Sequence, residues 1–216
     1  MKQANVEVDV NRVPLTSIDG VRDFTSMTGR FYAEYGYDAT PLLEWNDRMR
    51  TWTSGIRRDF GEKLKHAAVV SEYGYGQFRN PEWKRSETHP LLALCTNDAS
   101  REVTIDGPQL VSVIKKNGND ATASQNFLDF VNSVQTIVFA GVTTTSCVTS
   151  TLTSLLDHMQ RKEIGLSHIV VARNGFAGRR SRAGDARRIL DQLAEQERVI
   201  MVPTLKDIRW VDRSRP

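Results

Sequence analysis

Short apolar runs alternate with longer amphipathic segments along this chain. The apolar runs predict strands at Val6–Val10, Ala67–Ser71, Val111–Ile114, Thr136–Ala140, His168–Ala172 and Val199–Val202. The amphipathic segments predict helices at Pro41–Phe60, Ala123–Val131, Cys147–Arg161 and Gly184–Gln196. Strands that alternate with helices of this length favour right-handed βαβ units. We therefore expect a single three-layer α/β/α domain over residues 1–216, with a mainly parallel sheet of about six strands.

Two segments do not follow this alternation. Thr16–Asp38 is rich in Gly, Asp and Tyr, and Glu72–Asp106 carries glycines, prolines and scattered aromatic residues. Long irregular segments within a compact domain are often lids or partner-binding loops. We expect both to lie over a pocket or across a subunit contact, and surface decoration is the alternative.

Composition narrows the class of protein. Of the 216 residues, 39% are hydrophobic and 25% charged, and the formal net charge is only +3, which gives no support for a nucleic-acid partner. The start of the chain lacks the apolar run of a secretory signal, and no stretch is apolar enough to span a membrane, so we expect a cytoplasmic protein without a membrane partner. Arginines gather at 179–182 and 187–188, where they form either a solvated surface or a pocket for an anion.

Cys147 is the candidate nucleophile. The buried strand Thr136–Ala140 is followed by Gly141 and a run of Thr and Ser, and Cys147 then begins a helix. Ligands of open parallel sheets bind beyond the carboxyl ends of the strands. Unpaired N–H groups at a helix start stabilise a thiolate and can receive an oxyanion. The alternative is that Cys147 is a small packed residue at a strand–helix corner.

The stretch Gly141–Val148, Gly-Val-Thr-Thr-Thr-Ser-Cys-Val, resembles the nucleophile turn of the isochorismatase-like cysteine hydrolases. Thr144 stands where that family has a threonine, whereas Thr145 stands where many members have Asp. The resemblance is specific from about Val111 to Leu156, and it implies the same α/β fold, with Cys147 as the residue that attacks a carbonyl.

The same resemblance implies two partners for Cys147. A catalytic lysine ends the strand before the cysteine strand, and Lys116 matches it best, with Lys115 as the fallback. A catalytic aspartate ends the first strand, and Asp9 is our choice, with Asp19 as the competitor. The resemblance further implies a cis peptide bond at Val142–Thr143 and an oxyanion hole made by the backbone N–H groups of Thr143 and Cys147.

Other residues are candidates for the pocket around Cys147. Tyr73, Tyr75 and Phe78, with Trp83 further along the same segment, are expected to line it and bind substrate. Arg179, with Arg180 beside it, is the candidate that meets a carboxylate of the substrate. Core packing of the aromatic residues and solvent exposure of the arginines are the competing interpretations.

We expect no metal and no other cofactor. Nicotinamidases belong to the family that this sequence resembles, and they have a metal site built from an Asp and two His after the second strand. The corresponding stretch here, Ser71–Phe78, contains no His. The chain has four histidines that share no ligand spacing. Its two cysteines form no CxxC pair and are too few for a disulfide scaffold.

Together these observations predict a metal-independent cysteine hydrolase that cleaves a C–N bond of a small amide, ureido or carbamoyl compound through a thioester on Cys147. One alternative is a catalytically weak relative with a binding or assembly role. Another is a hydrolase of vinyl ethers or esters that works through Asp9 and Lys116. The resemblance also implies a homo-oligomer, a dimer or a tetramer.

Overall fold

The computed structural model describes residues 5–83, 86–105 and 109–214. Its strands are β1 (Val6–Asp9), β2 (Leu15–Ile18), β3 (Lys65–Ser71), β4 (Gln109–Lys116), β5 (Thr136–Val142), β6 (His168–Ala177), β7 (Val199–Val202) and β8 (Ile208–Val211). Its α-helices are α1 (Arg22–Thr25), α2 (Arg30–Tyr35), α3 (Thr40–Phe60), α4 (Gln125–Asn132), α5 (Thr149–Gln160) and α6 (Ala183–Ala194).

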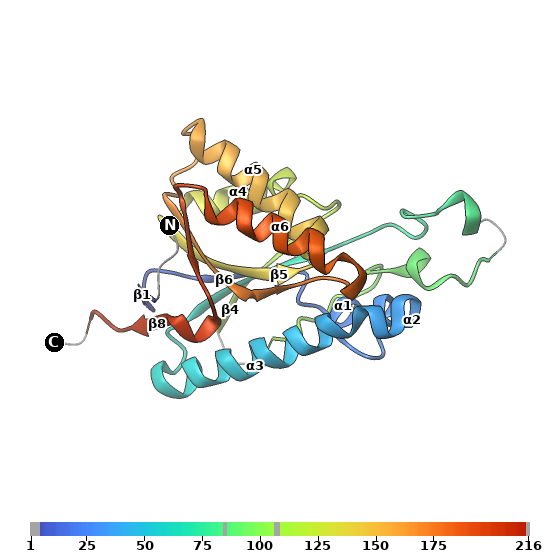
Figure 1. Ribbon diagram of the computed structural model, residues 1–216, viewed down its shortest axis with the longest axis horizontal. Coiled ribbons are helices and arrows are strands. Elements are labelled where there is room, and N and C mark those ends of the chain that lie inside the picture. The colour runs from blue at the N-terminus through green and yellow to red at the C-terminus, as the bar shows by residue number, and fades with distance from the viewer. Residues whose placement is uncertain (1–4, 84–85, 106–108, 215–216) are drawn as a thin grey trace.

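Six strands form a parallel sheet in the order β4-β3-β2-β5-β6-β7. Helices α4, α5 and α6 cover one face of this sheet, and α1, α2 and α3 cover the other (Figure 1). Each face has its own cluster of buried apolar side chains, one beneath α3 and one beneath α4, α5 and α6. The expected three-layer α/β/α architecture with a mainly parallel sheet is thus confirmed.

The first strand of the central sheet is not the one expected from the sequence. The predicted strand Val6–Val10 forms as β1, but it pairs with β8 in a separate two-stranded parallel sheet. The place between β3 and β5 belongs to β2, which lies in the segment expected to be irregular. All four residues of β2 are buried, since both edges of the strand are paired and both of its faces are covered. A strand in that position needs no alternation of polar and apolar residues.

The carboxyl ends of β2 and β5 approach each other closely. A Cβ on Gly141 of β5 would lie 2.8 Å from the Cβ and from the carbonyl oxygen of Ile18, so only glycine fits there. The next residue after β2, Asp19, adopts the left-handed region with φ of 52°. A non-glycine residue in this region is strained and is often found at a functional site.

The segment between β3 and β4 extends away from the three layers before it returns to the body of the molecule (Figure 1). It contains 3-10 turns at Pro81–Trp83 and Pro90–Ala93, and its residues 84–85 and 106–108 lie outside the described part. Among the described residues, no helix combines the length and the apolar character needed to cross a membrane.

Candidate functional site

Three buried polar residues meet at the carboxyl ends of neighbouring strands. Lys116, the last residue of β4, places its Nζ 2.9 Å from Asp19 Oδ2 and 3.3 Å from Cys147 Sγ. Asp19 is fully buried, and Lys116 and Cys147 are 2% and 3% exposed. A buried ion pair is costly to desolvate and persists only in good geometry, so this arrangement indicates a specific site.

Asp19, rather than Asp9, occupies the carboxylate position beside Lys116. Asp9 ends β1, where its side chain accepts hydrogen bonds from the backbone and side chain of Asn11 at 3.0 and 3.1 Å and lies 3.6 Å from Arg12. Its carbonyl accepts from the N–H of Val13, just before the amino end of β2. Asp9 and Asp19 therefore lie at opposite ends of β2, and the placement expected for Asp9 is wrong. The alternation of Glu7 and Asp9 with valines fits the edge position of β1.

Of the two candidate lysines, the structure brings Lys116, the first choice from the sequence, to the buried site. Lys116 points into the buried site, whereas the side chain of Lys115 is 54% exposed and pairs with Glu72 at 2.7 Å. The alternation of side chains along β4 explains the difference, because neighbouring residues of a strand point to opposite faces.

Cys147 lies in a π-helical turn, Thr144–Val148, that precedes α5. The helix therefore starts later than the sequence predicts. The peptide bond between Val142 and Thr143, immediately before this turn, is cis, as expected. Thr143 is buried beside the sulfur-bearing turn, and its carbonyl accepts hydrogen bonds from the N–H groups of Ser146 and Val148.

The surroundings of Cys147 oppose ionisation of its thiol. Burial raises its pKa to about 12, the Asp19 carboxylate acts in the same direction, and the Lys116 ammonium opposes them. Burial and the Asp19 carboxylate therefore act against the thiolate that a helix start favours. Burial lowers the pKa of Lys116, but its interactions with Asp19, Cys147 and Tyr73 together outweigh burial, so that the pKa of Lys116 is raised and this side chain stays charged.

A chain of hydroxyl groups links the lysine to the far side of the sulfur. Lys116 Nζ donates to Ser71 Oγ at 2.6 Å, and Ser71 Oγ donates to the hydroxyl of Tyr73 at 2.6 Å. The Tyr73 hydroxyl lies 4.0 Å from Cys147 Sγ, and burial raises the pKa of this phenol. Asn119 Oδ1 accepts from the thiol at 3.6 Å. Neither Ser71, the last residue of β3, nor Asn119, three residues after the end of β4, was predicted.

The remaining residues predicted to bind substrate lie at different depths. Phe78 packs edge-on against Tyr73, with ring centroids 4.5 Å apart, and so lies next to the site. Tyr75 is 63% exposed, and its hydroxyl donates to the carbonyl of Glu87. Trp83 stacks on His89. Arg179 stacks on the ring of Tyr35 and lies 3.8 Å from Asp38, so it is not among the contacts of the sulfur.

The histidines take no part in the site. His66 is buried and shares a hydrogen bond of 2.7 Å with Ser17, His89 lies 3.1 Å from Glu34, and His158 lies 2.6 Å from Glu163. Within residues 5–83, 86–105 and 109–214, no cluster of three or more His, Cys, Asp or Glu has the arrangement of a metal site. Around the sulfur, a lysine ammonium occupies the space between the candidate donors, so the residues present do not fit a metal.

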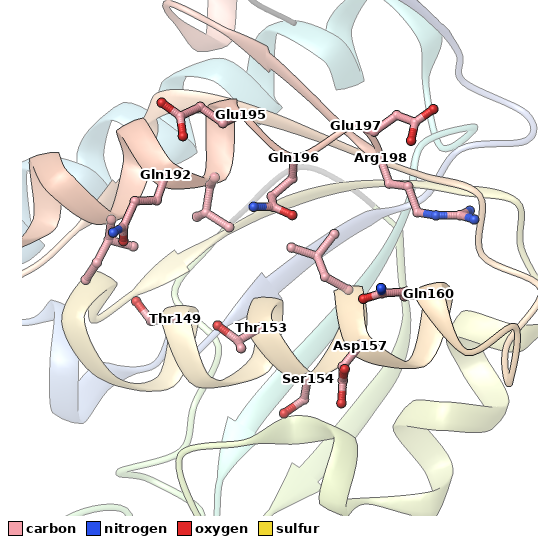
Figure 2. A pocket seen from close by; sticks show the side chains of 13 residues that line it. Thr149, Thr153, Ser154, Asp157, Gln160, Gln192, Glu195, Gln196, Glu197 and Arg198 are labelled. Carbon is pink, nitrogen blue, oxygen red and sulfur yellow. The ribbon is translucent and has the colours of Figure 1, made fainter.

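A hollow elsewhere on the molecule is unrelated to this site. It has a volume of about 820 Å³ and lies between α5 and α6, lined mainly by polar side chains of these helices and of the connection to β7 (Figure 2). Neither Asp19, Lys116, Tyr73 nor Cys147 is among the residues that line it.

Comparison with known proteins gives a consistent fold assignment. No protein-family model matches the chain, and no curated protein matches it in sequence. Among solved structures, it is similar to a pyrazinamidase of Pyrococcus horikoshii in complex with zinc, with 19% identity and a TM-score of 0.62 over 89% of this chain and 99% of that one.

Two further solved structures support the same assignment. An N-carbamoylsarcosine amidase from Thermoplasma acidophilum is 18% identical, with a TM-score of 0.59 over 91% of this chain and 98% of that one. An isochorismatase-like hydrolase from Alkaliphilus metalliredigens is 15% identical, with a TM-score of 0.62 over 91% and 96%. The parallel sheet, the turn that carries Cys147 and these likenesses together lead to one conclusion: the chain has the fold of the isochorismatase-family hydrolases.

Proposed function

We propose that this protein is a cysteine hydrolase that cleaves a C–N bond of a small amide, ureido or carbamoyl compound, with Asp19, Lys116 and Cys147 as its catalytic residues. The observation that carries the proposal is the single ammonium of Lys116 in contact with both the Asp19 carboxylate and the Cys147 sulfur. The fold likeness to two amidases agrees with it. No step of the reaction requires a metal.

The first half of the reaction forms a thioester. The protonated thiol gives its proton to Asp19 as the sulfur attacks the carbonyl carbon. Asp19 is suited to this, because Lys116 is the only partner of its Oδ2 within the described residues and the carboxylate interacts with the thiol. Lys116 stabilises the negative charge as it moves from the Asp19 carboxylate to the sulfur of Cys147 during this proton transfer. The C–N bond then breaks, and Asp19 returns the proton to the departing nitrogen.

The second half releases the acyl group. Asp19, again a carboxylate, takes a proton from water, and the resulting hydroxide attacks the thioester carbonyl. The C–S bond breaks and the sulfur regains the proton, so that the free acid leaves and the resting thiol is restored. In both halves the backbone N–H groups of Thr143 and Cys147 would stabilise the oxyanion. Tyr73 and Phe78 would contact the substrate from the side of the β3–β4 segment.

The proposal is tested by measuring ammonia or amine release from a panel of small amides, ureido acids and carbamoyl compounds. The wild-type protein should hydrolyse at least one member, and Cys147→Ala should lower that turnover by at least about a thousandfold. Cys95→Ala is the matched control, because Cys95 is also a buried free cysteine, and it should leave turnover within a few fold. Full activity of Cys147→Ala would rule out the covalent mechanism.

A second candidate function is a binding or assembly role without turnover. The observation that favours it is the buried, protonated thiol, since a structural cysteine has the same character. Iodoacetamide at pH 7 to 9 separates the two proposals. A hydrolase should lose turnover in proportion to the fraction of Cys147 that is alkylated, whereas a binding protein should hydrolyse nothing in the panel whatever the extent of alkylation.

A further inference from the structure

A second cavity lies beside the turn that carries the nucleophile, between α3, the end of β6 and α6. Its volume is about 470 Å³, within the range of small-molecule sites. Its described lining contains a single acidic side chain, Glu44, and five arginines: Arg48, Arg173, Arg179, Arg180 and Arg187. Such an excess of positive charge in one hollow favours an anion.

Several of these arginines are oriented by uncharged neighbours. The guanidinium groups of Arg179 and Arg180 stack on Tyr35 and Tyr37, each 4.3 Å from the ring centroid. Arg48 Nε donates to the carbonyl of Asn174 at 3.0 Å. Stacking and a carbonyl partner fix the orientation of a guanidinium and leave other N–H groups available to a ligand.

The nearby carboxylates only partly neutralise the cavity. Asp38 lies 3.8 Å from Arg179, but it accepts hydrogen bonds from the backbone N–H and the hydroxyl of Ser181 at 2.6 and 2.8 Å. Glu44 is 4.0 Å from Arg180. Arg173 has a close partner in Asp191 at 2.7 Å, whereas Arg187 has no ion pair within the described part of the chain. Burial also lowers the pKa of Arg48, which indicates a cation removed from water.

The cavity is distinct from the site around the sulfur. Thr144 lines it and begins the π-helical turn that carries Cys147, so the two sites share this turn. Asp19, Lys116, Tyr73 and Cys147 do not line it. The acyl chemistry proposed above therefore requires nothing from the arginines.

We propose that this cavity binds a small molecule that carries two or more phosphate groups. Guanidinium groups converge on it from α3, from β6 with the turn that follows, and from α6. Tetrahedral phosphates accept hydrogen bonds from several such directions at once, and arginine binds them in a bidentate manner. Carboxylates accept mainly in one plane, which suits this arrangement less well.

The test is calorimetric titration of the full chain with inorganic pyrophosphate at low ionic strength. The wild-type protein should bind one equivalent, and Arg187→Ala should weaken binding by about tenfold or more, as expected for loss of a charged hydrogen bond. The matched control is Arg188→Ala: Arg188 is the next residue of α6, pairs with Asp185 and does not line the cavity. It should bind within twofold of wild type.

Two further titrations test which ligand binds and whether binding is independent of the site around Cys147. Cys147→Ala should bind pyrophosphate as tightly as wild type, whatever its effect on hydrolysis, so the outcome is independent of the proposed reaction. Citrate should bind at least tenfold more weakly than pyrophosphate at equal ionic strength. Absence of saturable pyrophosphate binding by wild type, equal losses in Arg187→Ala and Arg188→Ala, loss of binding in Cys147→Ala, or equal affinity for citrate would each overturn the proposal.

Discussion

Lys116 is the residue on which the account of the site depends. Its ammonium contacts a carboxylate, a hydroxyl, a backbone carbonyl and a sulfur, all within 3.3 Å. Because the group is almost fully buried, each contact replaces water that the charge would otherwise hold. In the proposed mechanism the same charge would stabilise the thiolate as the sulfur attacks.

The choice between the two aspartates can be tested by kinetics. Asp19→Asn removes the proton acceptor and should lower kcat by about 10²–10⁴-fold, the usual contribution of a general base. Asp9→Asn is the control, because the Asp9 carboxylate contacts Asn11 and Arg12 near the other end of β2, and its kcat should stay within a few fold of wild type. Equal losses in the two variants, measured on the same substrate, would contradict the assignment.

The buried ion pair also predicts a stability effect. Lys116→Met leaves Asp19 buried without a counter-ion and should lower the free energy of unfolding by about 3–5 kcal/mol at pH 7. The control Lys115→Met removes only an exposed pair with Glu72 and should change it by less than about 1 kcal/mol. Urea unfolding measures both.

A double variant separates charge from packing. In Asp19→Asn/Lys116→Met neither charge of this buried pair remains, so a large part of the lost stability should return. A double variant as unstable as the sum of the two single variants would show that the ion pair is not the cause.

At the scale of elements, the site exists because β2 rather than β1 lies at the centre of the sheet. Most of the strands and the four long helices were predictable, because the apolar pattern of each continues over enough residues to be recognised. The sequence Leu15-Thr-Ser-Ile is short and half polar, so it carries no such signal, whereas Val6–Val10 has the alternation of an ordinary strand. Asp19 was consequently missed as first choice, although it is the residue that directly follows a fully buried run.

The position of the thiol illustrates a second limit of sequence analysis. The strand–turn–helix around Cys147 was predicted, but the π-helical turn was not, because nothing in Thr144–Val148 distinguishes it from the first turn of an α-helix. The pKa of Cys147 depends on burial and on Asp19, and both come from segments distant in sequence. Such effects appear only once the strands are assembled.

The pairing of β2 with β3 predicts a pH effect on stability. Burial lowers the pKa of His66 to about 4, against an ordinary value near 6.5, so the folded protein keeps this residue neutral where the unfolded chain binds a proton. Stability should therefore fall as pH drops from 7 towards 4, with a loss of about 2 kcal/mol between pH 7 and 5 from this residue. Urea unfolding at both pH values measures the loss.

The variant His66→Gln isolates this contribution. Glutamine keeps a hydrogen-bonding group near Ser17 but does not titrate, so the difference between pH 7 and pH 5 should shrink by about the amount assigned to His66. An unchanged difference would show that another group is responsible.

At the scale of the whole molecule, β1 and β8 bring the two ends of the described chain together beside α3. Trp210 of β8 is buried in the apolar cluster beneath α3 and packs against Trp52, with ring centroids 6.0 Å apart. The pairing of Val6–Asp9 with Ile208–Val211 thus adds a small sheet to the α3 side of the molecule, away from the nucleophile turn.

Substitutions of Trp210 test how much this small sheet contributes to the free energy of unfolding. Trp210→Ala should lower the free energy of unfolding by about 3–5 kcal/mol through loss of buried contacts. Trp210→Phe should cost less than about 2 kcal/mol, because the indole N–H has no hydrogen-bond partner among the described residues and its removal leaves no acceptor unpaired. Chemical denaturation checks both, and a Phe variant as unstable as the Ala variant would contradict this account of the packing.

The most direct test of the central claim is to trap the acyl intermediate. The protein is mixed with a substrate found in the amide panel, quenched in acid within the first turnovers, and analysed by intact mass and peptide mapping. The account predicts an added mass equal to the acyl group on the peptide that contains Cys147, strongly reduced in Asp19→Asn and absent in Cys147→Ala. Turnover that persists in Cys147→Ala, or an acyl group carried by Cys95 instead, would contradict it.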